Sequence, residues 1–448
     1  MRKYFNRLMK KERESPDENI GWASFSFLDI VSGFRSGGDV NGGASEDSLY
    51  PNRHAGWHLP PQNIDKENGY VRSSVRYFIK YAVQKAPQSL TVWTETLVTK
   101  VLIDDGNTAT GVEYMKGANL YKASPLHKNH GSNKRAVYAK REIIISGGAF
   151  NTPQLLMLSG IGDPHQLKNW DIPVKSGLVG VGKNLQDHQE ISLNLQMQYP
   201  HKDLAECRNS ANPLENPCFV AYAEKHTGPY AASGAIFGIS TKTSKELEEP
   251  NVYILGAVAM FYGYHQGYSI EAGNSTDKVS FVMLKGHTKN NNGYVQLRSS
   301  DPTDVPDINF LFWSDGDDDI RDNAKQLKWM RKQFEQGPLN KQYVKKELLP
   351  GLNANVEEYV RHNSWGHHAC CTAKMGSKDD PLAVLDNQLR VYGIQGLRVV
   401  DASIFPKIPG FFVTVPIEMV SEKAADMIIE QANKESDRCT LRSSEYTV

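Results

Sequence analysis

One segment constrains the fold of this chain more than any other. The run Ile143-Ile144-Ile145 is followed by the pair Gly147-Gly148 and by an apolar stretch that ends near Gly160. Consecutive β-branched apolar residues favour a short strand that is buried on both faces. Two glycines at the carboxyl end of a strand let the backbone approach a ligand, because no Cβ stands in the way. Pro153 suits the first turn of a helix, so the segment predicts a strand, a glycine turn and a helix.

The residues after the glycine pair extend this pattern. Asn151 or Thr152 can cap the helix, and Gly160 can end it. A glycine pair alone would also be consistent with an ordinary turn between a strand and a helix. The whole string from Gly147 to Gly162, however, resembles nearly position for position the second signature of the glucose–methanol–choline (GMC) oxidoreductases. In that family the segment lies beside the flavin.

Three further segments resemble the same family and occur in its order, which is far more specific than any one motif. They are Gly180–His188, which resembles the loop leaving the FAD domain; Gly293–Arg298 with Asp301-Pro302 and Pro306-Asp307-Ile308, which resemble a strand and turn of the substrate domain; and Gly396–Pro406 with Ser421–Asp426, which resemble the C-terminal closure. The resemblance implies FAD as cofactor and a small-molecule alcohol as substrate. Among the family's branches, the insect glucose dehydrogenases and ecdysone oxidases are the most similar in character. The electron acceptor, oxygen or a quinone, stays open.

The resemblance and the strand and helix patterns together predict a mixed α/β (α+β) fold. An FAD-binding Rossmann-like domain, incomplete at its N-terminus, is interrupted by an inserted antiparallel-sheet substrate domain. The expected organisation is an irregular segment at 1–70, part of the FAD-binding domain at 71–188, the substrate domain at 189–365, the closure of the FAD-binding domain with the active-site loop at 366–434, and a tail at 435–448. Expected strands include Ser89–Val92, Ser192–Gln198, Cys218–Tyr222, Val252–Ala257 and Val279–Leu284, and expected helices include Ser73–Ala86, Arg321–Gln336, Lys341–Leu348 and a last one from about Ile417 to Ala432.

The catalytic candidate is His368. It stands four residues before Thr372 and seven before Met375, the spacing of the family's active-site histidine. Oxidation of an alcohol by a flavin requires that the hydroxyl proton be removed while a hydride passes to flavin N5. An imidazole suits this proton transfer, which contributes on the order of 10²–10⁴ in rate. A histidine chosen without the motif would more often be structural, and His367 is the alternative base.

The second catalytic position departs from the family pattern. The usual His or Asn partner falls on Phe412, which cannot hold a substrate oxygen by a hydrogen bond. Thr414 is a possible substitute, since side chains two apart on an extended segment share a face. The phenyl group indicates either a bulky apolar or sterol-like substrate or weakened catalysis, and the sequence leaves both open.

The resemblance also implies which residues contact the cofactor. Val98 matches a position whose backbone contacts the adenine, and Asp401 and Ala402 match the stretch near the ribityl chain and pyrophosphate. The flavin-side turn supplies the remaining positions: Gly147, Gly148, Ala149, Asn151 and Thr152. For Asp401 a cap of a helix or turn is the plain alternative.

The G-x-G-x-x-G turn that should open such a fold is absent from the printed sequence, and so is the family's first signature. Gly177–Lys183 fits the start of a phosphate loop, but Asn184 replaces the required Ser or Thr. We therefore expect the chain to be a truncated form of a longer flavoenzyme. The alternative is a degenerate relative that binds an apolar ligand without redox chemistry.

Composition excludes several other classes. Lys+Arg and Asp+Glu are both 51, so no net field favours nucleic acid or an anionic membrane. No apolar run is long enough to span a bilayer. The five cysteines have no zinc-site spacing, so no metal is expected; Cys207 and Cys218 could pair in a secreted protein or remain buried thiols. The first residues lack the apolar core of a signal peptide, and localisation stays open, with secretion possible if the true N-terminus lies elsewhere.

Overall fold

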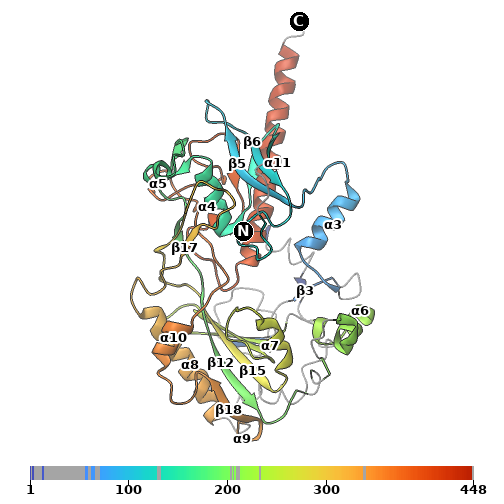
Figure 1. Cartoon of the computed structure of the whole chain (residues 1–448), viewed down its shortest axis with the longest axis vertical. Helices are drawn as coiled ribbons and strands as arrows, with labels where there is room; N and C mark the ends of the chain where they lie inside the picture. The colour runs from blue at the N-terminus through green and yellow to red at the C-terminus, as the bar shows by residue number, and fades with distance from the viewer. Residues whose placement is uncertain are drawn as a thin grey trace.

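The fold was analysed in a computed structural model of the whole chain. It describes residues 71–128, 133–201, 204, 206, 207, 212–231, 234–336 and 340–445, together with the short pieces 1, 3–4, 13–14, 56–58 and 62–65. The expected irregular segment at 1–70 therefore lies almost wholly outside the described residues. Figure 1 shows two packed bodies, with the strands β5 and β6 in one and the long strands β12 and β15 in the other.

The first body is built around the strand–turn–helix predicted from the sequence. β8 (Ile143–Ile145) pairs in parallel with β19 (Leu397–Val399), and α4 (Gly148–Leu158) follows the glycine turn. A three-stranded antiparallel sheet, β5 (Thr96–Ile103), β6 (Ala109–Lys116) and β7 (Lys134–Tyr138), packs beside α4. The expectation that the isoleucine run is buried on both faces is wrong, because Ile144 points away from this core and is 44% exposed.

The second body contains a six-stranded antiparallel sheet with the order β18-β12-β15-β14-β13-β2. Its strands are β2 (Gly56–His58), β12 (Gln189–Met197), β13 (Ala235–Thr241), β14 (Val252–Ala257), β15 (Lys278–Lys285) and β18 (Val344–Leu349). Two helices, α8 (Asp318–Gln336) and α10 (Val356–Asn363), lie on one side of the sheet in Figure 1 and bury its apolar face. This inserted antiparallel sheet confirms the predicted mixed fold class.

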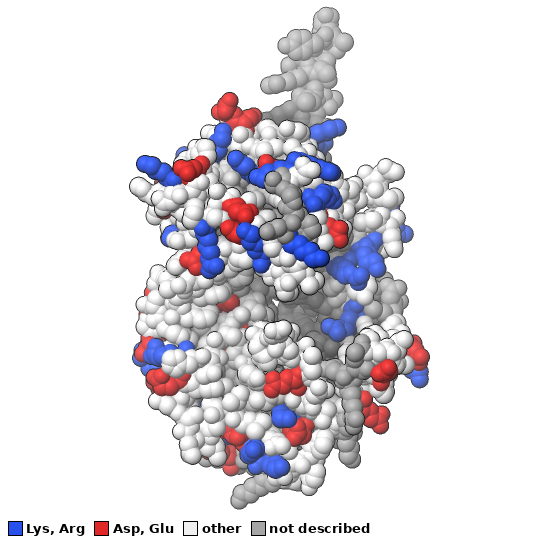
Figure 2. Space-filling view, in the orientation of Figure 1, with Lys and Arg blue, Asp and Glu red and all other residues white. Residues whose placement is uncertain are grey.

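The structure contains further helices and strands besides these. They are the helices α3 (Val75–Lys85), α5 (Pro164–Asn169), α6 (Pro217–Lys225), α7 (Tyr268–Asn274), α9 (Asn340–Tyr343) and α11 (Thr414–Glu445), the strands β9 (Ile161–Gly162), β10 (Ser176–Gly177), β11 (Lys183–Leu185), β16 (Gly293–Gln296) and β17 (Asp307–Asn309), and the two-to-four-residue pieces β1 (Arg13–Glu14), β3 (Gln62–Asp65) and β4 (Val71–Arg72). No described helix is both long enough and apolar enough to cross a membrane. Figure 2 shows Lys and Arg side chains interspersed with Asp and Glu over both bodies.

Two predicted elements are wrong in type. Lys341–Leu348 was expected to be helical, but only Asn340–Tyr343 is, and the chain continues as the edge strand β18. The backbone of β12 offers this segment ladder hydrogen bonds, which override its helical pattern. Ser89–Val92 forms no strand.

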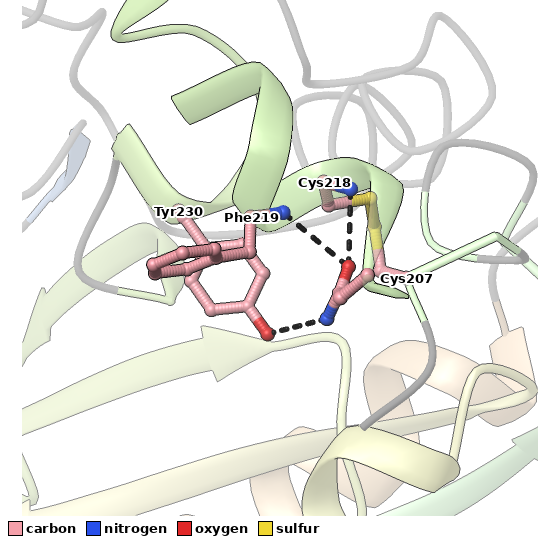
Figure 3. Close-up of a disulfide and its surroundings, with 5 residues drawn as sticks. Cys207, Cys218, Phe219 and Tyr230 are labelled. Carbon is pink, nitrogen blue, oxygen red and sulfur yellow. Dashed lines mark hydrogen bonds between the residues drawn. A yellow bond between two sulfur atoms is a disulfide. The ribbon is translucent and has the colours of Figure 1, made fainter. Parts of the chain in front are cut away.

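Cys218–Tyr222 was also expected to be a strand and lies in α6 instead. The signal was present in the sequence, because Asn216 caps the helix and Pro217 occupies its first position. Asn216 Oδ1 accepts from the backbone N–H groups of Cys218 and Phe219, and Cys207 forms a disulfide with Cys218, as Figure 3 shows. The structure thus contains a disulfide between these two cysteines, whose pairing the sequence left open.

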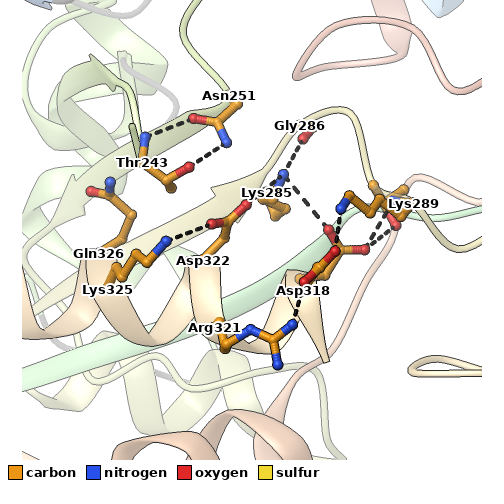
Figure 4. A network of polar contacts seen from close by, with 12 residues as sticks. Thr243, Asn251, Lys285, Gly286, Lys289, Asp318, Arg321, Asp322, Lys325 and Gln326 are labelled. Atoms are coloured by element: carbon orange, nitrogen blue, oxygen red, sulfur yellow. Dashed lines mark hydrogen bonds and ion pairs between the residues drawn. The ribbon is translucent and has the colours of Figure 1, made fainter. Parts of the chain in front are cut away.

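A buried ion pair fixes the end of β15 to α8. The Lys285 ammonium is 3.7 Å from a carboxylate oxygen of Asp319 and 3.5 Å from one of Asp322, and it donates to the Gly286 carbonyl (Figure 4). A Cβ on Gly286 would come within 2.7 Å of the Phe411 ring, so this corner can only be occupied by glycine without displacing that ring. The ion pair therefore helps to place an aromatic residue next to the candidate site.

We expect Gly256→Ala to destabilise the inserted sheet. Gly256 lies between Phe237 on β13 and Phe281 on β15, and an added Cβ would overlap the Phe237 ring. Overpacking of this kind costs typically 1–3 kcal/mol. Urea unfolding of this variant and of Gly106→Ala, whose Cβ would meet the Asp104 side chain at 3.3 Å, measures the effect. Equal midpoints in the two variants would contradict the packing described.

Candidate active site

Two short segments that are far apart in the sequence form the candidate site. Residues 186–190 run antiparallel to residues 365–370 at the junction of the two bodies. Glu190 and Trp365 exchange both backbone hydrogen bonds, at 2.8 and 3.0 Å, and Gln186 and Cys370 do the same at 3.2 and 3.0 Å. This pairing fixes the separation of the segments and places His188 opposite His368.

The Asp187 carboxylate holds the two histidine backbones together. Its Oδ1 accepts from the backbone N–H of His188 and from that of His368, both at 2.8 Å. Gly366 allows this approach, because a Cβ there would lie 2.5 Å from the Asp187 carboxylate. Burial raises the pKa of Asp187 to about 7, although the two hydrogen bonds favour its charged form.

The side chains of His188 and His368 are in direct contact. Their Nδ1 atoms are 3.1 Å apart, and the rings meet edge to face at a centroid distance of 5.1 Å. Burial lowers the pKa of His188 to about 3 and that of His368 to about 2; the neighbouring His367 charge adds to the effect on His368. Both rings are therefore neutral near pH 7, and one nitrogen of His368 is able to accept a proton.

Glu190 and His367 form a second pair beside the first. His367 Nδ1 is 2.7 Å from Glu190 Oε1, and His368 Nδ1 is 3.9 Å from the same oxygen. Burial raises the pKa of Glu190, while at His367 the hydrogen bond and charge of Glu190 outweigh burial and raise its pKa. The ligand atoms of these three residues lie within 4.8 Å of one another and are of the kinds that zinc prefers, so the expectation of no metal stays a prediction.

Aromatic rings line the space next to His368. Phe412 meets the His368 ring at a centroid distance of 5.8 Å with the planes 88° apart. Tyr253 touches both Phe412 and Phe411, at 5.1 and 5.5 Å between centroids. Phe412 as a residue is 37% exposed, so its ring is not enclosed in the core. The structure thus brings the predicted residues His368 and Phe412 together.

Thr414 does not lie on the extended segment on which the sequence analysis expected it. The extended segment ends before Thr414, which is the first residue of α11 and is exposed. The expected start of this helix near Ile417 was three residues late. The rule that alternate side chains share a face does not apply across this boundary, so the role of Thr414 as a substitute loses that support.

The glycine turn and Asp401 form a second polar cluster. Asp401 Oδ2 accepts from the Gly148 backbone N–H at 2.9 Å and from the Thr152 hydroxyl at 2.6 Å. Asp401 also caps the short turn Ala402–Ile404, as the plain reading of the sequence allowed, through a 2.7 Å bond from the Ser403 backbone N–H. One carboxylate therefore joins the two segments expected to contact the cofactor.

The same cluster is connected to the histidine segment. The Thr372 hydroxyl donates to the Ala149 carbonyl at 2.6 Å, and the Cys371 backbone N–H donates to the Ala402 carbonyl at 3.1 Å. Thr372 lies four residues after His368, so the predicted base and the glycine turn share one rigid hydrogen-bonded frame.

Two predicted cofactor residues lie at the edge of this frame. Val98 on β5 is 37% exposed. Asn151 is exposed on the first turn of α4, where its amide donates to the Tyr121 hydroxyl at 3.0 Å. Neither contacts the histidine cluster, and their cofactor roles stay predictions.

Sequence reasoning missed three residues of the site: Asp187, His188 and Glu190. The segment that ends in Asp187-His188 was recognised only as a loop leaving the first domain. A signal existed, since an adjacent carboxylate and imidazole at the start of a buried strand are unusual without a function. Nothing in the sequence spacing, however, places them opposite residues 365–370.

Comparison with known proteins adds independent findings. Two family models, both described as GMC oxidoreductase, match residues 34–190 and 289–421. Human mitochondrial choline dehydrogenase is 35% identical over 346 residues, which cover 75% of this chain and 53% of that protein. An oxygen-dependent choline dehydrogenase of Stenotrophomonas maltophilia is 32% identical over 368 residues, covering 80% and 60%. The chain thus spans between about half and two thirds of these relatives.

Solved structures agree in fold. Formate oxidase from Aspergillus oryzae superposes with a TM-score of 0.76 at 22% identity, over 94% of this chain and 72% of that one. Pyridoxine 4-oxidase from Mesorbium loti gives a TM-score of 0.69 at 19% identity, over 92% and 71%. At these identities the likeness concerns the fold alone.

The two neutral histidines predict a specific pH dependence of stability. The pKa of each ring in the folded protein lies far below its value of about 6.5 in the unfolded chain. As the pH falls through 6.5, only the unfolded chain takes up a proton, so the free energy of unfolding decreases. Between pH 7 and pH 5 each ring should cost about 2 kcal/mol of unfolding free energy.

The stability difference between wild type and His368→Gln should therefore shift by about 2 kcal/mol over this range, with the wild type losing more. Asp187 and His367, whose pKa values are raised in the folded protein, increase the free energy of unfolding as the pH falls. Both residues are present in wild type and in His368→Gln. Urea titrations at pH 7, 6 and 5 measure the slope, with exposed His362→Gln as the control for loss of a histidine. Parallel pH profiles of wild type and His368→Gln would contradict a buried neutral His368.

Proposed function

The chain belongs to the GMC oxidoreductase family, and we propose that it is an FAD-dependent oxidoreductase that acts on the CH–OH group of an alcohol, with His368 as the base. The observation that carries the proposal is the position of His368. Burial keeps its ring neutral, the ring contacts the Phe412 ring edge to face, and the segment belongs to the same hydrogen-bonded frame as the glycine turn. A base beside a cofactor turn is the arrangement that this reaction needs.

The glycine turn is suited to a bound flavin nucleotide. Gly148 has φ +77°, and a Cβ at this residue would meet nothing within 4 Å, so open space adjoins the backbone. The Gly147 and Gly148 N–H groups donate to Thr152 and Asp401, so it is the positive end of the α4 dipole that favours an electron-rich ligand here. Gly147, Gly148 and Ala149 would hold the flavin side, and Asp401 and Ala402 the ribityl side. When bound, FAD supplies the acceptor for the hydride.

The chain's own residues supply the proton transfer. His368 is uncharged near pH 7 and can take the hydroxyl proton of an alcohol. Glu190 Oε1, 3.9 Å from His368 Nδ1, lies where a carboxylate favours the imidazolium that results. His368 and Glu190 are both buried, which strengthens these electrostatic interactions.

The substrate that we propose is an apolar, sterol-like alcohol. Phe412 takes the place of a hydrogen-bonding partner and, with Tyr253 and Phe411, offers apolar surface next to His368. Burying a ring against such a substrate gains roughly 1.5–3 kcal/mol, whereas a sugar hydroxyl facing it loses a hydrogen bond costing about 1–3 kcal/mol. The site is less suited to a cation such as choline, because the buried Glu190 carboxylate already pairs with His367, with 2.7 Å between Oε1 and Nδ1.

We expect His368→Ala to lower kcat by about 10²–10⁴ in FAD-loaded protein extended by a G-x-G-x-x-G unit. Steady-state turnover with a panel of alcohols measures it, and the visible flavin spectrum shows whether the variant still binds FAD. Near-parental turnover would place the base elsewhere, with His367 the first suspect. A parent protein that binds flavin and oxidises no alcohol would favour a non-catalytic binder of apolar ligands.

We expect Phe412→Asn to shift the preference from apolar towards polar alcohols. The amide can hydrogen-bond a substrate oxygen that the phenyl ring cannot, and the apolar contact is lost. The measurement is kcat/KM for a sterol alcohol, choline and glucose in both proteins. Tyr253→Phe, which retains the ring beside Phe412, is the matched control. A parent that prefers glucose or choline, or an unchanged ratio in Phe412→Asn, would contradict the proposed substrate class.

A further inference from the structure

We propose that His188, held by Asp187, is a positioning residue that keeps the proton of His368 on Nδ1 and so leaves His368 Nε2 as the basic nitrogen. The inference rests on the proposed function, because it assigns the atom that takes the alcohol proton. It concerns the Asp187-His188 pair, which neither the sequence motifs nor the proposed reaction had yet given a role.

The contact between the two rings requires one donor and one acceptor. The Nδ1 atoms are 3.1 Å apart, a hydrogen-bond distance, and a neutral imidazole has one N–H and one lone pair. Two neutral rings that share a hydrogen bond through Nδ1 must therefore be in opposite tautomers. The neighbouring groups decide which ring carries its proton on Nδ1.

The surroundings of His368 decide the assignment. His188 Nε2 forms no hydrogen bond within the described residues, although the Gly410 backbone, which raises the pKa of the His188 ring, is nearby. On His368, Glu190 Oε1 lies 3.9 Å from Nδ1 and attracts a proton there. His188 Nδ1 is thus the acceptor and His368 Nδ1 the donor.

The backbone keeps the pair in register. Asp187 Oδ1 accepts from both histidine N–H groups at 2.8 Å, so the two Cα positions cannot separate without breaking a buried charge-assisted hydrogen bond. His188 is fully buried and His368 is 7% exposed, so water does not compete for the shared hydrogen bond. This packing fixes the tautomer of His368 without any loop motion.

The tautomer can be read directly in the 448-residue chain by nitrogen NMR with ¹⁵N-labelled histidine, without flavin or turnover. The variant His368→Gln assigns the signals. In wild type we expect His368 to show an N–H type Nδ1 and a lone-pair type Nε2. His188→Asn, whose amide oxygen can replace Nδ1 as acceptor, should keep this pattern, and His188→Leu should lose it. Exposed His362→Leu controls for removal of a histidine.

The FAD-loaded protein provides the second readout. We expect His188→Leu to lower kcat by about 10–100-fold with KM little changed, and His188→Asn to restore most of the rate. If His188→Leu fails to fold, the wild-type and His188→Asn spectra still test the assignment. A wild-type His368 with its proton on Nε2, or a His188→Leu variant with wild-type kcat, would overturn the proposal. A correct tautomer in a protein that oxidises no alcohol would leave the assignment standing and refute the proposed function alone.

Discussion

The candidate site depends on one carboxylate oxygen. Asp187 Oδ1 receives the backbone N–H groups of His188 and His368, which lie 180 positions apart in the chain. Because this oxygen is buried, water does not compete for the two hydrogen bonds, and they are strongest when Asp187 is ionised. Without them the backbones of the two segments would depend on the ladder at Glu190–Trp365 and Gln186–Cys370. The position of His368, the proposed base, therefore depends on a polar junction that forms between two apolar cores.

The site combines this polar junction with an apolar lining. Burial has opposite effects on the charge of its histidines and on the pKa of its carboxylates. Burial keeps His188 and His368 uncharged, which suits a base that must accept a proton, but it also raises the pKa of Asp187 and Glu190. The pairing of Glu190 with His367 offsets part of that cost. In the proposed function Phe412 adds apolar surface beside the substrate, so the burial that keeps His368 uncharged would also favour an apolar alcohol.

Much of this could be predicted from local pattern. The glycine turn and α4 follow from glycine, proline and apolar spacing, and His368 follows from its spacing to Thr372 within a family motif. What could not be predicted depends on tertiary pairing. The burial of Ile144 depends on which strands flank β8, and the strand at Val344–Leu349 depends on β12 offering its edge. His188 acquires a role only because residues 186–190 meet residues 365–370.

The most direct test of the account is anaerobic mixing of the FAD-loaded protein with an apolar secondary alcohol that carries either hydrogen or deuterium on its carbinol carbon. The account predicts that the visible absorbance of oxidised flavin is lost, that the loss is slower with deuterium, and that His368→Gln slows it further. Retention of the absorbance with every alcohol, in a protein that holds FAD stoichiometrically, would contradict the claim that this site oxidises alcohols.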